Sequence, residues 1–131
     1  MDPEDAAAAI QHQIDAIWIS NHGGRMVDNT ISSIEALAQI APLAQLSNTP
    51  LFVDGGFRSG TDILKALALG ADFVFLGRPV LYGLAVGGSE GVRVLLERLE
   101  TELEMAMKHC GVRRPSEASS KGILYTLRPK L

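Results

Sequence analysis

The chain has 131 residues, of which 47% are hydrophobic and 21% charged, so its composition is that of a globular domain and not of a disordered segment. Twelve basic and fifteen acidic side chains give a net charge of -3, which argues against an extended nucleic-acid interface. No apolar stretch reaches the roughly 18 residues of a membrane span, and the acidic residues 1–5 do not resemble a secretory signal. The single cysteine, Cys110, can form no internal disulfide, which fits a reducing compartment.

Basic charge is concentrated near the C-terminus. Residues 113–131 carry five basic side chains and one acidic side chain, whereas residues 1–112 carry seven and fourteen. We therefore expect a folded unit over 1–112 and a basic tail over 113–131. A solvated terminus is the favoured interpretation of this tail, and binding to an anionic surface is the alternative.

The first predicted element is a helix near residue 3, with Asp2 as its N-cap and Pro3 in its first turn. A short apolar run over 16–19 follows, and runs over 51–53 and 73–76 have the same character. None of the three alternates apolar with polar residues. Such runs are typical of strands in a parallel sheet that is covered on both faces.

Helical patterns lie between these strands. One runs over 32–45, where we expect Pro42 to kink or break the helix, and another begins with Thr61 as its cap and ends at Gly70. The longest covers about 89–108, with apolar residues on one side. Helices and strands thus alternate along the chain, which predicts a parallel α/β fold.

Each predicted strand is followed by a loop that contains glycine, over residues 21–25, 54–58 and 77–79. Ligands of parallel α/β folds bind beyond the carboxyl ends of the strands. In the second loop, glycines allow backbone N–H groups to approach an anion, the next helix adds its positive end, and an arginine supplies a forked donor. The third loop repeats this chemistry. We therefore predict one phosphate site formed by Gly55, Gly56, Arg58, Gly77 and Arg78, the alternative being that the glycines only make tight turns.

The first loop contains His22 and Arg25. A histidine at a strand end can act as a general base, and an arginine three residues later can bind a carboxylate, although loop histidines are more often surface residues. The three histidines and one cysteine show no spacing typical of metal ligands. The sequence also lacks the dinucleotide fingerprint G-x-G-x-x-G and the P-loop motif.

Three segments together resemble a known family. They are I-S-N-H-G-G-R at 19–25, D-G-G-F-R-S-G-T-D at 54–62 with K-A-L-A-L-G at 65–70, and L-G-R-P at 76–79. In this order and spacing they closely resemble the FMN-dependent α-hydroxy-acid oxidases and dehydrogenases, which include glycolate oxidase, lactate oxidase, mandelate dehydrogenase and the flavin domain of flavocytochrome b2. The resemblance covers about residues 2–112.

The resemblance implies a TIM barrel, the (β/α)8 fold, of which this chain would supply the C-terminal part with strands six to eight. It implies that His22 is the catalytic base and binds substrate together with Arg25, which would hold the carboxylate of a small 2-hydroxy acid. Ser20 would lie near the flavin and Asp54 would bind the ribityl hydroxyls. The FMN phosphate would be held by the loop residues Gly55, Gly56, Phe57, Arg58, Gly77 and Arg78. The implied reaction is oxidation of a 2-hydroxy acid to a 2-oxo acid.

The chain is short for this fold, since a (β/α)8 barrel takes about 250 residues. The family's strand with a flavin-contacting lysine would lie upstream of residue 3. We therefore expect an open inner sheet face around Phe52, Val53 and Phe75, which would be covered by self-association or by a separate N-terminal half. We also expect little or no turnover by the chain alone, with weak FMN binding retained.

Two other functions remain open from the sequence. One is a non-catalytic product of a truncated or split gene that keeps an FMN- or phosphate-binding half-barrel. The other is a different phosphate-binding TIM barrel similar to IMP dehydrogenase, which would not need S-N-H-G-G-R. The ending P-K-L at 129–131 differs by one residue from a peroxisomal address, so we expect a peroxisomal or a cytoplasmic location.

Overall fold

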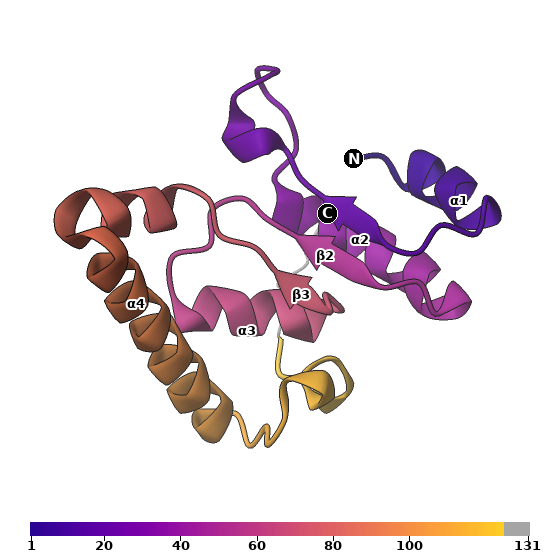
Figure 1. Ribbon diagram of the computed structural model, residues 1–131. Coiled ribbons are helices and arrows are strands. Elements are labelled where there is room, and N and C mark those ends of the chain that lie inside the picture. The colour runs from indigo at the N-terminus through magenta and orange to yellow at the C-terminus, as the bar shows by residue number, and fades with distance from the viewer. Residues whose placement is uncertain (125–131) are drawn as a thin grey trace, which may run out of the picture.

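The computed structural model describes residues 1–124, and the predicted alternation of helices and strands is confirmed (Figure 1). Three strands, four α-helices and three short 3-10 turns (η) follow one another in this part of the chain. Their bounds are α1 Pro3–Gln11, β1 Ile17–Ile19, η1 His22–Gly24, α2 Ser33–Ser47, β2 Leu51–Val53, α3 Gly60–Leu69, β3 Phe73–Val74, α4 Arg78–His109, η2 Pro115–Glu117 and η3 Ser119–Lys121.

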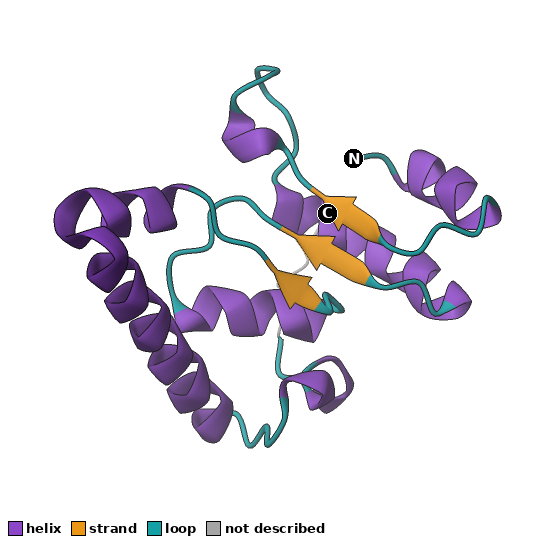
Figure 2. Ribbon diagram, in the orientation of Figure 1, coloured by secondary structure: helices purple, strands orange, loops and turns teal. Residues whose placement is uncertain are grey.

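The three strands form one parallel sheet in the order β1-β2-β3. Trp18 pairs with Phe52, which in turn pairs with Phe73, so the strands are in step across the sheet. All three arrows point the same way in Figure 2. The loops that follow them therefore leave from the same edge of the sheet, as we predicted.

Helices cover one face of this sheet. Ile19 and Val53 on that face are almost completely buried and join the main core with Leu37 and Ile40 of α2. Successive residues of a strand point to opposite faces, so a strand can bury its two ends and expose its middle. The expectation that Val53 would lie on the open face is therefore wrong.

The opposite face of the sheet carries four aromatic side chains. The rings of Trp18 and Phe75 are stacked with centroids 4.3 Å apart, and Phe52 contacts Phe73 edge-on at 6.3 Å. Trp18 is 55% exposed and Phe73 is 59% exposed, although aromatic rings of this size normally form part of a core. The expected open apolar face is thus present, and we call these four residues the aromatic face.

Helix α2 continues through Pro42, where we expected a kink or a break. Proline removes the hydrogen bond to the carbonyl of Ala38, but both residues are exposed, so water can reach that carbonyl. A capping box formed by Ser32 and Glu35 fixes the start of the helix.

The starts of α3 and α4 also differ from the prediction. Ser59, and not Thr61, caps α3, whereas Gly70 ends this helix in a left-handed conformation as predicted. Helix α4 begins at Arg78, and its predicted part is only the segment after a kink at Gly87 and Gly88. The segment before the kink has no apolar stripe facing a core, which is why the hydrophobic pattern did not reveal it.

The described residues after α4 pack back onto α3. Val112 and Ala118 are buried with Leu64, Leu67 and Met107 in a second core cluster. The domain boundary at residue 112 stays a prediction, as does the location of the protein, because residues 129–131 lie outside the described part. Within residues 1–124, no helix is long and apolar enough to cross a membrane.

Candidate functional site

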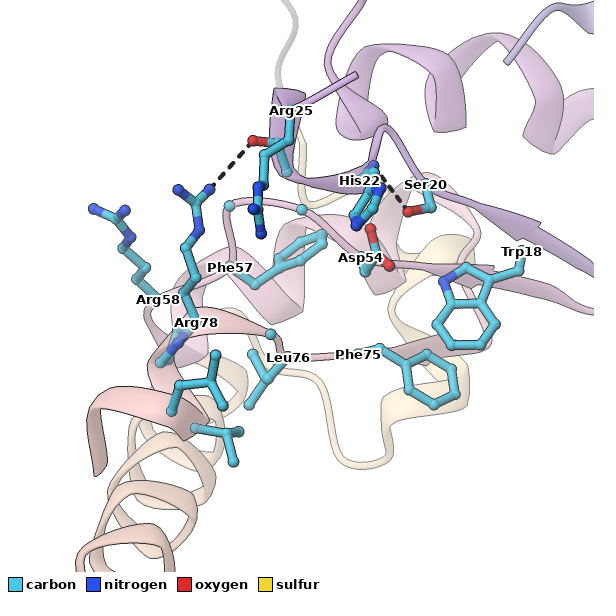
Figure 3. A pocket seen from close by; sticks show the side chains of 17 residues that line it. Trp18, Ser20, His22, Arg25, Asp54, Phe57, Arg58, Phe75, Leu76 and Arg78 are labelled. Atoms are coloured by element: carbon cyan, nitrogen blue, oxygen red, sulfur yellow. Dashed lines mark hydrogen bonds between the residues drawn. The ribbon is translucent and has the colours of Figure 1, made fainter. Parts of the chain in front are cut away.

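The loops after the three strands enclose a cavity of about 480 Å³ at one edge of the sheet (Figure 3). This volume lies within the usual range for small-molecule and cofactor sites. All ten residues that the sequence singled out line the cavity, which brings together Ser20, His22, Arg25, Asp54, Gly55, Gly56, Phe57, Arg58, Gly77 and Arg78. Their roles stay predictions, but their proximity is a property of the fold.

The loop after β1 holds His22 in an unusual backbone conformation. His22 has a φ of 55°, and Gly23 and Gly24 follow with φ of 66° and 71°. A left-handed conformation is unfavourable for a residue with a Cβ atom, and such residues are concentrated at functional sites. The His22 N–H donates to Ser20 Oγ at 3.2 Å, which helps to fix the turn.

The base of the same loop is anchored on α2 through Asn21. Its backbone N–H donates to the buried Ser33 Oγ at 3.3 Å, and its side-chain Nδ2 donates to the Ile31 carbonyl at 3.4 Å. The imidazole of His22 thus projects from a loop that is attached to the core on its inner side. Sequence reasoning did not assign a role to Asn21 or Ser33.

The loop after β2 needs glycine at two positions for different reasons. Gly55 has a φ of 98°, and a Cβ atom there would lie 2.9 Å from Ser33 Oγ. Gly56 has a φ of 89°, and a Cβ atom there would meet nothing within 4 Å. Gly55 therefore allows the loop to pack closely on α2, whereas Gly56 leaves open space beside the cavity.

Side chains of the protein occupy the N-terminus of α3, which we expected to contribute to phosphate binding. Ser59 Oγ accepts from the Asp62 N–H at 3.1 Å, and Glu102 Oε2 of α4 accepts from the Gly60 N–H at 3.0 Å. The N–H of Arg58 likewise donates to Asp62 Oδ2 at 3.2 Å. The first-turn donors of α3 are thus partly used, because these side chains take the place of an external anion.

The N-terminus of α4 is different. Its cap, Gly77, makes no side-chain capping bond, and the helix begins with Arg78 and Pro79 at the wall of the cavity. Arg78 Nη2 donates to the Gly23 carbonyl at 3.4 Å and so links the third loop to the first. Figure 3 shows the side chains of Arg58 and Arg78 next to each other.

The charge of the cavity favours an anionic ligand. Three arginines line it, Arg25, Arg58 and Arg78, together with a single carboxylate, that of Asp54. Arginine binds phosphate and carboxylate groups through two parallel hydrogen bonds, and a positive cleft draws anions toward it. Within residues 1–124 there is no group of three His, Cys, Asp or Glu residues that could hold a metal ion.

Apolar residues complete the cavity, and sequence reasoning missed them as site residues. Trp18 and Phe75 of the aromatic face line it on one side, and Leu76, Val80 and Leu81 line it near the start of α4. The signal in the sequence is their place directly before or after the glycine loops. A flat ring system bound here could pack against aromatic side chains and form hydrogen bonds with polar ones.

Comparison with known proteins identifies the family. Residues 1–125 match the FMN-dependent dehydrogenases. The chain belongs to this family. The resemblance predicted from the three loops is therefore confirmed, and the match covers nearly the whole chain.

Curated relatives of this chain include 2-hydroxyacid oxidases. The chain is 45% identical over 120 residues to 2-hydroxyacid oxidase from Dictyostelium discoideum, covering 92% of this chain and 31% of the relative. It is 44% identical over 123 residues to human 2-hydroxyacid oxidase 2, covering 94% of this chain and 35% of the relative. The chain thus spans about a third of the length of the relatives that it matches.

Solved structures of mandelate oxidase have the same fold over this region. The complex with benzoyl-formic acid gives a TM-score of 0.86 at 43% identity, covering 91% of this chain and 35% of that chain. A variant with a monooxide FMN adduct gives 0.86 at 43% identity, covering 91% and 38%. The α/β fold of this chain is therefore that of a fragment of these FMN-dependent oxidases.

Proposed function

We propose that this chain is the part of an FMN-dependent 2-hydroxy-acid oxidase or dehydrogenase that binds the FMN phosphate and supplies the catalytic base. In this proposal β1, β2 and β3 are strands six to eight of a (β/α)8 barrel. The observation that carries it is that His22 and Arg25 line the same cavity as the glycine loops of the predicted phosphate site.

The lining of the cavity fits FMN. Gly56 and Gly77 would carry a Cβ atom into open space, so their backbone can approach a phosphate closely. Arg58 and Arg78 supply guanidinium donors for that phosphate, and the N-terminus of α4 adds backbone dipoles. The carboxylate of Asp54 is a suitable acceptor for ribityl hydroxyl groups.

The first loop supplies the chemistry on the substrate. FMN, when bound, accepts the electrons that leave the substrate. An imidazole nitrogen of neutral His22 accepts a proton from the 2-hydroxy acid, and the backbone turn to Ser20 holds the ring at the cavity wall. Arg25 binds the substrate carboxylate through its forked guanidinium, which orients the hydroxyl-bearing carbon.

Turnover depends on protein surface beyond this chain. The relatives are about three times as long, and the aromatic face borders the cavity, with Trp18 more than half exposed. Water entry on this side weakens the electrostatic interactions on which such catalysis depends. We therefore propose that in the active form further polypeptide or a second copy of this chain covers the aromatic face, and that the alternative is a non-catalytic FMN-binding fragment.

The phosphate site is tested by comparing FMN with riboflavin, which has the same ring system but no phosphate. Binding is followed as the loss of flavin fluorescence when the purified chain is added. We expect FMN to bind at least about tenfold more tightly than riboflavin, because charge-assisted hydrogen bonds to the phosphate are lost in riboflavin. Equal affinity for the two flavins would contradict the assignment of the phosphate loops.

The aromatic face is tested by sedimentation velocity over a range of protein concentrations. We expect the chain to self-associate, since exposed apolar area drives association. This association should weaken in a Phe73→Ser variant, because Phe73 is exposed and lies outside the cavity. Leu46→Ser is the matched control, because Leu46 is 88% exposed but lies on α2. A compact monomer at all concentrations would contradict pairing of this face with a second copy of the chain.

A further inference from the structure

Glu102 of α4 makes a long-range contact with the start of α3. Its Oε2 accepts a hydrogen bond from the Gly60 N–H at 3.0 Å, across 42 residues of sequence, and its Oε1 accepts from Arg98 Nε at 3.1 Å. Glu102 does not line the cavity. The carboxylate therefore connects two helices behind the predicted phosphate site.

The backbones of α3 and α4 also touch at this point. A Cβ atom on Gly60 would lie 2.0 Å from the backbone nitrogen of Leu103 and 2.4 Å from the carbonyl carbon of Glu102. Such distances leave no room for a side chain, so only glycine allows this approach. Gly60 and Glu102 thus form a contact that fixes both the spacing and the register of the two helices.

The contact is connected to both predicted phosphate arginines. On the α3 side, Arg58 is joined to the helix by its own N–H, which donates to Asp62 Oδ2, while Ser59 caps the same turn. On the α4 side, Arg78 begins the segment before the kink at Gly87 and Gly88, and this segment packs on the segment of Glu102 so closely that a Cβ atom on Gly91 would lie 2.1 Å from the Gly83 carbonyl oxygen. The distance between the two guanidinium groups therefore depends on how α3 sits against α4.

We propose that Glu102 is a positioning residue for FMN, which holds Arg58 and Arg78 at the separation needed to bind one phosphate group. This inference rests on the proposed function of the cavity. It assigns to α4 a role beyond packing, because the carboxylate fixes the helix that carries one arginine relative to the loop that carries the other.

The pKa of the Glu102 carboxyl is consistent with a charged group in this contact. The Gly60 N–H, and after it Arg98, hold this pKa below its ordinary value. A charged Glu102 also places negative charge at the N-terminus of α3, which by itself would repel a phosphate. If Glu102 positions the arginines, its removal should weaken FMN binding. If Glu102 only repels the phosphate, its removal should strengthen FMN binding.

Two substitutions separate these effects. Glu102→Gln keeps an oxygen acceptor for the Gly60 N–H and removes the charge, whereas Glu102→Ala removes both. Leu99→Ala is the control for stability, because Leu99 is a buried residue of α4 one turn away. FMN and riboflavin affinities are measured by flavin fluorescence for each variant. We expect FMN to bind about tenfold more weakly to Glu102→Ala, and within about threefold of the unchanged protein to the other two, since the acceptor and not the charge positions the arginines.

Tighter FMN binding by both Glu102 variants would mean that the carboxylate only repels the phosphate, and equal weakening by Leu99→Ala would mean that any loss of α4 stability has the same effect. Either result overturns the proposal. An unchanged affinity in Glu102→Ala overturns it as well.

A second measurement does not depend on FMN. In ¹H–¹⁵N spectra of the flavin-free chain, we expect the Arg58 and Arg78 amide resonances to shift in Glu102→Ala and to keep their positions in Glu102→Gln. Failure of the unchanged protein to bind FMN would remove the proposed function of the cavity, and unshifted amides in Glu102→Ala would remove the coupling of the two helices. The two failures are therefore distinguishable.

Discussion

The guanidinium of Arg78, at the first residue of α4, donates a hydrogen bond to the carbonyl oxygen of Gly23 in the loop after β1, with Nη2 and O 3.4 Å apart. Arg78 also lines the cavity beside Arg58. A single side chain thus lies between the predicted phosphate site and the loop that carries His22. A phosphate bound to Arg78 would compete with the Gly23 carbonyl for the guanidinium N–H donors, or would share these donors with it.

Replacing Arg78 should therefore affect both sites. We expect Arg78→Ala to bind FMN about tenfold more weakly, and Arg78→Lys to lose less, because lysine keeps the charge but not the forked donor. In both variants the amide resonances of residues 22–24 should shift. Arg113→Lys is the matched control, since Arg113 is an exposed arginine outside the cavity. Unchanged resonances over 22–24 in Arg78→Ala would show that the two loops are not linked.

The two glycines after β2 should respond differently to substitution. In Gly55→Ala the new methyl group meets Ser33 Oγ, and we expect a loss of about 2 kcal/mol or more in the free energy of unfolding from left-handed strain and crowding. In Gly56→Ala the methyl group faces open space, so we expect a loss of only about 1 kcal/mol.

FMN affinity should follow the opposite order. The Gly56 methyl group would stand where a phosphate approaches the backbone, so Gly56→Ala should weaken FMN binding more than Gly55→Ala does, provided that both are measured below their unfolding transitions. Urea unfolding and flavin titration give the two quantities separately. The same order in both measurements would mean that Gly56 has only a conformational role.

Much of the fold and the site could be predicted because the deciding signals are local. Asp2 caps α1 from the adjacent position, and Gly70 ends α3 where the apolar stripe stops. The three glycine loops each follow an apolar run, and parallel strands bring their carboxyl ends to one edge. The pattern of strands and loops therefore placed His22 and Arg58 at the same edge of the sheet, and the family resemblance joined them in one site.

Other features depend on contacts between distant residues. Ser59 and Thr61 are both possible caps, and the close approach of Gly60 to α4 places the start of the helix at Gly60. The capping of α3 by Glu102 depends on a residue 42 positions away, which no local pattern indicates. A continuous apolar run also does not reveal which of its residues face outward, so Val53 was placed on the wrong face of the sheet.

The turn after α1 offers a stabilising substitution. Gln13 follows the helix with a φ of 54°, a conformation in which glycine is favoured. We expect Gln13→Gly to raise the free energy of unfolding by about 0.5–1 kcal/mol, because the left-handed strain of glutamine is removed. Ala8→Gly, inside the helix, should instead lower it by about 1 kcal/mol. Equal effects of the two variants in urea unfolding would contradict this account of the turn.

The contact between Glu102 and Gly60 should make stability depend on pH. Since the pKa of Glu102 is lowered on folding, its contribution is present above the ordinary value of 4.5 and is lost as the pH falls through the lowered value. Arg98 adds to this lowering, whereas Asp62 opposes it. The advantage of the unchanged protein over Glu102→Gln should therefore shrink between pH 6 and pH 3 in urea unfolding. A difference that stays constant over this range would contradict a charged contact.

The central claim, that the glycine loops and the arginines beside them hold FMN, is tested most directly by titrating FMN into the ¹⁵N-labelled chain. We predict that the amide resonances of Gly55, Gly56 and Gly77 shift with FMN concentration, whereas those of Gly111, just after α4, and Gly122, at the end of η3, do not. Riboflavin should shift the phosphate-loop glycines much less than FMN does. Shifts that are absent from Gly55, Gly56 and Gly77, or that are the same for both flavins, would contradict the claim.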